Sequence, residues 1–129
     1  MPRRTLEPLT EAMFYVLLCL HGRSMSGMEI AEHVERLTDG RVRLGPGTLY
    51  AILATFQKEE VAEKQVPEGR RIPYAITEHG EELYQKEIAR LRCCLADAER
   101  EEWSIEREER QDGEDRETIQ YGSAELAPV

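Results

Sequence analysis

Apolar side chains recur at the three- and four-residue spacing of an amphipathic helix in four separate segments of the chain. Thr10 precedes the first segment as a residue suited to cap a helix, and Gly22 ends it. Ser26 and Glu29 open the second segment with the spacing of a capping box, in which each side chain bonds the other's backbone amide. The second segment therefore predicts a helix, ended by Asp39-Gly40, whose buried side consists of Ile30, Val34 and Leu37.

A third helix is predicted from Pro46, because its fixed backbone angle suits a first helical position. The buried side of this helix consists of Leu49, Ile52, Leu53 and Phe56. The opposite side then carries mostly small residues, namely Thr48, Ala51, Ala54, Thr55 and Lys58. Residues 61–66 and 71–76 flank a turn containing Pro and Gly, which predicts a β-hairpin. Because Pro73 cannot donate to a ladder, we expect it at an edge, as in an isolated two-stranded unit.

The fourth helix begins after Thr77 and has the apolar spacing of a helix that packs lengthwise on another helix. Its repeating residues are Tyr84, Ile88, Leu91, Leu95 and Ala98. The partner is either the first helix or a second copy of the chain. The first helix is too short to cover a helix of about 30 residues, which favours the second copy. Beyond residue 110 the composition is typical of a disordered end.

Three helices, a hairpin and a long helix follow one another in the order of a winged helix-turn-helix with a dimerisation helix. We therefore expect a mainly α fold with a two-stranded β wing. Residues 1–80 would form a DNA-binding domain, residues 81–110 a C-terminal dimerisation helix, and residues 111–129 a disordered acidic tail.

The net charge of -9 is distributed unevenly along the chain. Residues 1–80 hold 10 Lys and Arg against 11 Asp and Glu, whereas residues 81–129 hold 7 against 15. A nearly neutral first part leaves open both a DNA-binding domain and a winged-helix module that binds only protein. Arginines on the two segments that flank a groove favour DNA binding; they are Arg41, Arg43, Arg70 and Arg71.

The residue pattern does not predict an enzyme, a cofactor or a metal site. The three cysteines include no paired Cys/His spacing, and we interpret Cys93 and Cys94 either as incidental thiols or as a redox sensor. No phosphate-binding glycine loop or nucleophile elbow is present. The apolar run 12–20 has nine residues, about half of a membrane span. Since the N-terminus also lacks the pattern of a signal peptide, we expect a cytoplasmic protein without membrane contact.

Specific motifs give the chain a family resemblance over roughly residues 9–98. Pro46-Gly47-Thr48-Leu49-Tyr50, followed by a hairpin that ends in Arg70-Arg71-Ile72-Pro73-Tyr74-Ala75-Ile76-Thr77, resembles the PadR-like family of bacterial transcriptional regulators. The resemblance implies a winged-helix homodimer that represses transcription from a pseudo-palindromic double-stranded DNA operator. In several members a small aromatic or drug-like ligand releases the repressor. The chain departs from the family pattern at Ala54-Thr55, where Lys-Arg is common, and at Glu60, where glycine is usual.

On the winged-helix interpretation, the expected phosphate contacts come from the free amides after Gly45 and from Arg41, Arg43, Thr48, Tyr50 and Lys58. Gly47 either lets the backbone approach a phosphate or only suits the turn. Thr48, Ala51, Ala54 and Thr55 offer methyl groups and hydroxyls but no bidentate pair with a base. Specificity would then depend on DNA shape, on the arm Arg3-Arg4, on Arg71, and on Arg70 entering the minor groove.

Trp103 is the only tryptophan and lies off the repeat of the fourth helix. It has two interpretations. With Phe14 and Tyr15 it would stack a flat aromatic ligand, as in some relatives, or it would cover the end of the dimer core.

Overall fold

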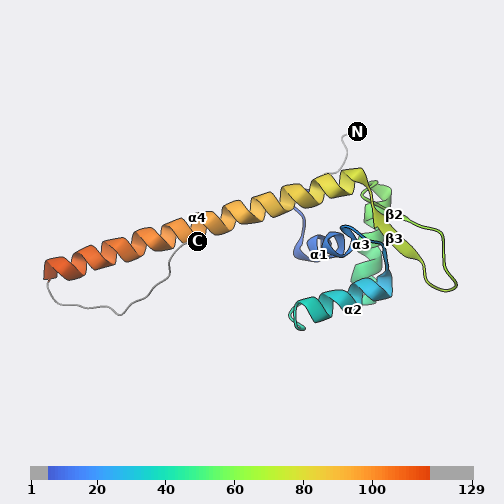
Figure 1. Ribbon diagram of the computed structural model, residues 1–129, viewed down its shortest axis with the longest axis horizontal. Helices are drawn as coiled ribbons and strands as arrows, with labels where there is room; N and C mark the ends of the chain where they lie inside the picture. Colours follow the sequence, from blue (N-terminus) through green and yellow to red (C-terminus); the bar gives the residue numbers. More distant parts are fainter. Residues whose placement is uncertain (1–5, 117–129) are drawn as a thin grey trace. The chain divides into compact units, whose positions relative to one another are not determined.

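The computed structural model describes residues 6–116. Four helices and a small sheet follow in the order α1 (Glu11–Leu20), β1 (Met25–Ser26), α2 (Gly27–Leu37), α3 (Pro46–Lys58), β2 (Ala62–Lys64), β3 (Pro73–Ile76) and α4 (Glu78–Arg116) (Figure 1). The chain divides into one compact unit that ends at Glu87 and a second that begins at Ile88. The first unit is a winged helix-turn-helix, as predicted, and the second contains the rest of α4.

Polar side chains cap the helices where the sequence predicted them. The Thr10 hydroxyl accepts a hydrogen bond from the Met13 amide at 3.1 Å. The Ser26 hydroxyl accepts from the Glu29 amide at 3.2 Å, and Glu29 Oε1 accepts from the Ser26 amide at 2.9 Å. These reciprocal bonds confirm the capping box.

The last turn of α3 ends through a residue in the left-handed region. Glu60 has a φ of 62°, although a side chain disfavours this conformation by roughly 1–2 kcal/mol. Its amide donates to the Gln57 carbonyl at 3.2 Å, and the Val61 amide donates to the Phe56 carbonyl at 2.7 Å. This pair of bonds is a Schellman motif, so the chain keeps the helix end typical of glycine with a glutamate in its place.

The sheet has three antiparallel strands in the order β1-β3-β2. The prediction of an isolated two-stranded unit with Pro73 at its edge was therefore wrong, because β3 is the central strand. Pro73 is tolerated there as the first residue of the strand, opposite Ser26 at the end of β1. The strands are also shorter than the runs 61–66 and 71–76 that predicted them. A two-residue strand such as β1 has too few side chains to produce an alternating pattern.

The core of the first unit lies between α1, α2, α3 and the sheet. Its fully buried side chains include Val16, Leu17, Leu20, Ile30, Val34, Leu49, Leu53, Phe56 and Val61. The prediction that Leu37 is buried was wrong: it is 53% exposed because the last turn of α2 extends beyond Val34. Cys19 lies in the core, where burial raises the pKa of its thiol to about 11.

Helix α4 begins in the first unit and continues through the second. The Thr77 hydroxyl caps it by accepting from the Gly80 amide at 3.0 Å. A side chain at Gly80 would overlap the Val61 carbonyl, so the start of α4 packs directly on the backbone before β2. Residues 111–116, predicted to be disordered, are helical, and residues 117–129 lie outside the described part. Among the described residues, no helix has the length and apolar character needed to span a membrane.

Candidate nucleic-acid interface

The outward side of α3 carries small side chains, as the sequence predicted. Since the buried side consists of Leu49, Ile52, Leu53 and Phe56, the helical period places Gly47, Ala51, Ala54 and Lys58 opposite the core. These four residues and Thr48 are exposed, and Thr55 is half-buried. Apart from Lys58, this side presents only methyl groups, hydroxyls and backbone.

The N-terminus of α3 is open to solvent. Gly45 is the N-cap and Pro46 the first helical residue, and no side chain among residues 6–116 caps the helix. Gly47 follows in helical conformation, and a Cβ added there would meet no atom within 4 Å. Therefore neither backbone angle nor packing within the described residues requires glycine at position 47. The phosphate contact expected at Gly47 stays a prediction.

Tyr50 lies against the N-terminus of α2. Its side chain is half exposed, and a Cβ at Gly27 would overlap the Tyr50 hydroxyl oxygen. The absence of a side chain at Gly27 thus lets the two helices hold this hydroxyl close to the surface. Sequence reasoning predicted Tyr50 as a phosphate contact but missed Gly27, whose partner is distant in sequence.

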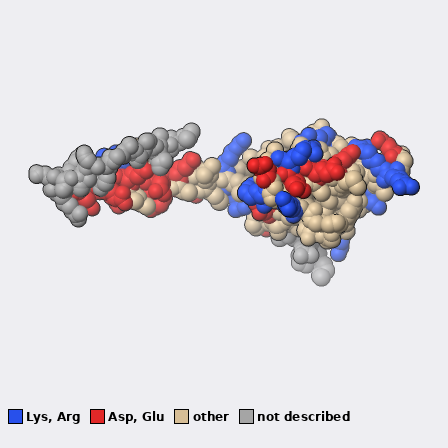
Figure 2. Space-filling view, turned by 90° about the horizontal axis from the view of Figure 1, so that it is seen from below, with Lys and Arg blue, Asp and Glu red and all other residues tan. Residues whose placement is uncertain are grey.

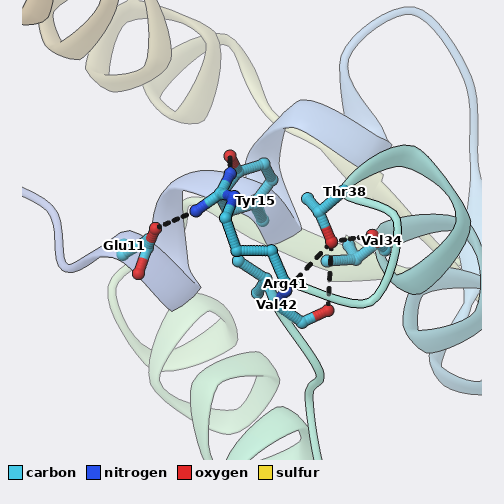
Figure 3. Close-up of polar contacts among 6 residues, drawn as sticks. All are labelled: Glu11, Tyr15, Val34, Thr38, Arg41 and Val42. Atoms are coloured by element: carbon cyan, nitrogen blue, oxygen red, sulfur yellow. Dashed lines mark hydrogen bonds and ion pairs between the residues drawn. The ribbon is translucent and has the colours of Figure 1, made fainter.

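Two of the arginines predicted to contact DNA are paired with carboxylates of the first unit. Arg41 donates from Nη1 to Glu11 Oε2 at 3.2 Å and from Nη2 to the Tyr15 hydroxyl at 2.9 Å (Figure 3). The Tyr15 and Glu11 hydrogen bonds raise the pKa of Arg41. Arg43 Nε lies 3.6 Å from Glu35 Oε2. Solvent screens exposed pairs of this kind, which add little stability, so a DNA phosphate can replace the carboxylate at little cost.

The loop that carries these arginines is fixed by Thr38. Its hydroxyl donates to the Val34 carbonyl at 2.8 Å and accepts from the Val42 amide at 3.0 Å (Figure 3). These bonds fix the first residues of the loop to the end of α2.

The wing, defined as residues 65–72 between β2 and β3, contains two arginines with different surroundings. Arg71 Nε donates to Glu29 Oε2 at 2.9 Å, and Arg71 Nη1 donates to Glu68 Oε1 at 2.7 Å. Arg70 is exposed and forms no ion pair with any described residue. The bond from Arg71 is the main reason why the pKa of Glu29 lies below its usual value. The predicted arm Arg3-Arg4 lies outside the described residues.

A shallow depression of about 370 Å³ separates Tyr50 of α3 from the wing. Exposed apolar residues line it together with Arg70, namely Met28 and Ile72. Figure 2 shows Lys and Arg gathered at the wing end of the first unit, at the right of the view, and both signs of charge across the neighbouring surface. Lys64 of β2 is a further exposed cation, which the sequence pattern did not indicate. On α3 and the wing strands, the exposed cations without an ion pair among the described residues are Lys58, Lys64 and Arg70.

An aromatic cluster joins α1 to the start of α4. The ring of Phe14 stacks on that of Tyr84 at 5.5 Å and meets the edge of Tyr15 at 5.4 Å. His21 adds a ring contact to Tyr84 at 5.0 Å, and its Nδ1 lies 2.8 Å from Glu81 Oε2. Tyr84 is buried within the first unit, so its side chain is already covered within the protomer, and its role in dimerisation stays a prediction.

The second unit presents an apolar stripe, defined as Ile88, Leu91, Leu95 and Ala98. Leu95 is 60% exposed and Leu91 40%, so no described residue covers them fully. Trp103 is also partly exposed, and the Arg107 guanidinium lies 6.0 Å from its ring centre. Cys93 and Cys94 are exposed free thiols.

Comparisons with known proteins identify a family and a fold. The profile of the transcriptional regulator PadR-like family matches residues 16–86. An uncharacterized 37.1 kDa protein in transposon TN4556 of Streptomyces fradiae is 32% identical over 84 residues, which are 63% of this chain and 24% of that protein. The chain thus spans about a quarter of the length of this curated relative.

Two solved structures share the fold. A transcriptional regulator from Clostridium thermocellum has a TM-score of 0.59 at 24% identity, over 64% of this chain and 83% of its own. A PadR family transcription regulator from Clostridium difficile has a TM-score of 0.59 at 18% identity, over 66% and 91% of the two chains.

Proposed function

Because the chain belongs to the PadR-like family of transcriptional regulators, we propose that it binds a pseudo-palindromic DNA operator as a homodimer and represses transcription there. We further propose that a small aromatic ligand releases it and that it acts in the cytoplasm. In this proposal α3 enters the major groove and the wing reaches the adjacent minor groove.

The observation that carries the proposal is the open N-terminus of α3 around Gly47. Helix N-termini bind phosphates because their first amides lack intrahelical acceptors and the helix dipole favours negative charge. No packing contact of the described residues requires a glycine at position 47. Its missing side chain leaves room for a phosphate oxygen beside these amides. Lys58 and Arg70 provide positive charge for further phosphate contacts. On binding DNA, Arg41 and Arg43 would leave the carboxylates of Glu11 and Glu35 and pair with phosphates instead.

The apolar stripe supports the homodimer. Four apolar residues spaced by three and four form a seam, and in water such a seam is stable only when it is covered. A second copy of the same helix provides a matching surface and sets two copies of α3 on one duplex. The effector proposal takes Phe14 and Tyr15 in the first unit and Trp103 in the second as separate candidate stacking groups.

Selection of bound sequences from a random DNA pool tests the proposal. We expect enrichment of an inverted repeat whose half-sites are about one helical turn apart, and an affinity that falls steeply with salt. Unselective recovery of the pool, or affinity independent of salt, would exclude an operator-binding regulator. Quenching of Trp103 fluorescence by planar aromatic compounds, compared with buffer, tests the effector separately.

A protein-binding module is the second candidate. It is favoured by the pairing of Arg41, Arg43 and Arg71 with carboxylates and by the exposed Met28 and Ile72 beside Tyr50. Such a module would recover no DNA in the selection experiment, which separates the two candidates.

A further inference from the structure

The two wing arginines have surroundings that assign them different tasks. We infer that Arg71 is a positioning residue that holds the wing on the N-terminus of α2, and that Arg70 is thereby presented to DNA. The inference rests on the proposed operator binding, and it gives a positioning role to Arg71, which the sequence predicted to contact DNA beside Arg70. Arg71 is 33% exposed and bridges two carboxylates, whereas Arg70 is exposed and has no ion pair with a described residue.

Glu29 is the anchor on α2. One carboxylate oxygen accepts from the Ser26 amide at 2.9 Å, and the other accepts from Arg71 at 2.9 Å. Ser26 also pairs with Pro73 in the sheet. The Glu29 carboxylate therefore links the cap of α2, the end of β1 and the wing.

Arg71 fixes the tip of the wing through its second carboxylate. The guanidinium contacts Glu68, and the backbones of these two residues exchange hydrogen bonds of 2.8 and 3.0 Å. Residues 68–71 thus form a closed turn that is tied to α2 from one side. Arg70 is one of the residues of this turn, so the fixed turn backbone limits where the Arg70 side chain can point.

The Tyr50 side chain of α3 packs against Gly27 at the N-terminus of α2. Because Arg71 of the wing contacts the same end of α2, this end sets the spacing between α3 and the wing. A duplex with α3 in the major groove and the wing in the next minor groove has one phosphate backbone between them. The depression is lined by Tyr50 of α3 and Arg70 of the wing, and we propose it as the place of that backbone. Arg71 there compensates the charge of Glu29, which would otherwise repel a phosphate.

Amide hydrogen exchange of the full-length protein without DNA tests the positioning contact. We expect Arg71→Ala and Glu29→Gln to speed exchange of the Glu68 and Arg71 amides. Glutamine retains the capping box, so the amides of α2 stay protected in the Glu29→Gln variant. Arg70→Ala and Glu32→Gln, the latter at an exposed site on the same helix, serve as controls with unchanged wing exchange. Equal exchange in wild type and Arg71→Ala would overturn the inference.

A double-mutant cycle on the selected operator tests the consequence for DNA. We expect Arg70→Ala to weaken binding about tenfold, the loss of one charge-assisted contact, and to lower the salt slope by about one. In the Glu29→Gln background the same substitution should cost less than about twofold, because the wing no longer holds Arg70 in place. In the Glu32→Gln background it should keep its full effect, which separates positioning from a general change of charge.

Two results would contradict the assignment. One is a full effect of Arg70→Ala in the Glu29→Gln background. The other is an Arg71→Lys variant that keeps wild-type affinity while its wing amides exchange faster, since Arg71 would then act as a phosphate contact. If wild type binds no DNA, the proposed function fails, and the exchange measurement still decides the wing contact.

Discussion

Gly47 and Glu60 both occupy positions that oppose their conformational preferences. Glycine in helical conformation loses more backbone entropy than alanine, and nothing in the described structure requires it at position 47. Glutamate at position 60 adopts a left-handed φ that glycine would adopt without strain. Each residue therefore lowers stability, but only Gly47 lies on the surface that we propose for DNA.

Substitution of Gly47 by alanine separates stability from binding. We expect Gly47→Ala to raise the free energy of unfolding by about 0.5–1 kcal/mol. The added Cβ should at the same time weaken operator binding about tenfold by keeping a phosphate away from the first amides of α3. Denaturant unfolding and DNA titration of one preparation measure both effects. Unchanged affinity would remove the reason that we give for this glycine.

Substitution of Glu60 by glycine should stabilise the protein. We expect Glu60→Gly to raise the free energy of unfolding by about 1 kcal/mol, because the left-handed conformation costs glycine little. Glu63→Gly is the matched control in extended β2 and should destabilise the protein instead. Denaturant midpoints of the two variants check the opposite signs.

The pKa of Glu29 predicts a dependence of stability on pH. Arg71 first, and then the Ser26 amide, hold this pKa below the ordinary value of 4.5. A group with a lowered folded-state pKa contributes stability above its unfolded pKa and loses it as pH falls. Unfolding curves between pH 6 and pH 3, at about half-unit steps, should therefore show a smaller acid loss in Glu29→Gln than in wild type. Parallel pH profiles would contradict the contact.

At the scale of elements, the sequence was sufficient wherever the signal is local. Three helix starts were predictable because a capping hydroxyl accepts a hydrogen bond from the amide three residues further on. The capping residues are Thr10, Ser26 and Thr77. The sheet order was not predictable, because β1 has only two residues and Pro73 made a central position unexpected. The pairing of Arg71 with Glu29 joins residues 42 positions apart, and no periodic pattern encodes such a contact.

The outward side of α3 predicts readout through methyl groups. Ala51 and Ala54 cannot form hydrogen bonds with bases, but their side chains fit the C5 methyl group of thymine. Replacing a contacted thymine of the selected operator by uracil should weaken binding about fourfold, the transfer energy of one methyl-sized group. The same replacement outside the half-sites is the control. Equal affinity for all these duplexes would leave the helix without direct readout.

At the scale of the whole chain, the acidic excess lies in residues 81–129 and the candidate interface in the first unit. The boundary between the compact units after Glu87 assigns Tyr84 to the first unit, so the seam proposed for dimerisation begins at Ile88. Sequence spacing alone could not separate Tyr84, which is buried, from the exposed members of the seam, because all of them follow the same periodicity.

Leu95→Glu tests the homodimer. We expect the dissociation constant of the dimer to rise about hundredfold, because a charge replaces an apolar side chain in the seam of each copy. Cys93→Glu is the control on the opposite side of α4, two residues from both Leu91 and Leu95. Sedimentation velocity measures the oligomeric state, and circular dichroism checks that both variants fold. A wild-type monomer at micromolar concentration would exclude this assembly.

The solvent-facing residues of α3 have a consequence for the divergence of paralogues. Ala51 and Ala54 are exposed and take no part in the core, so mutations there are nearly neutral for folding. A side chain at Gly80 would overlap the Val61 backbone carbonyl, so a replacement there disturbs the scaffold, and a side chain at Gly27 would displace Tyr50. A duplicated copy of this gene can thus acquire a new target promoter through substitutions on the exposed face of α3. Purifying selection preserves the residues that hold the fold.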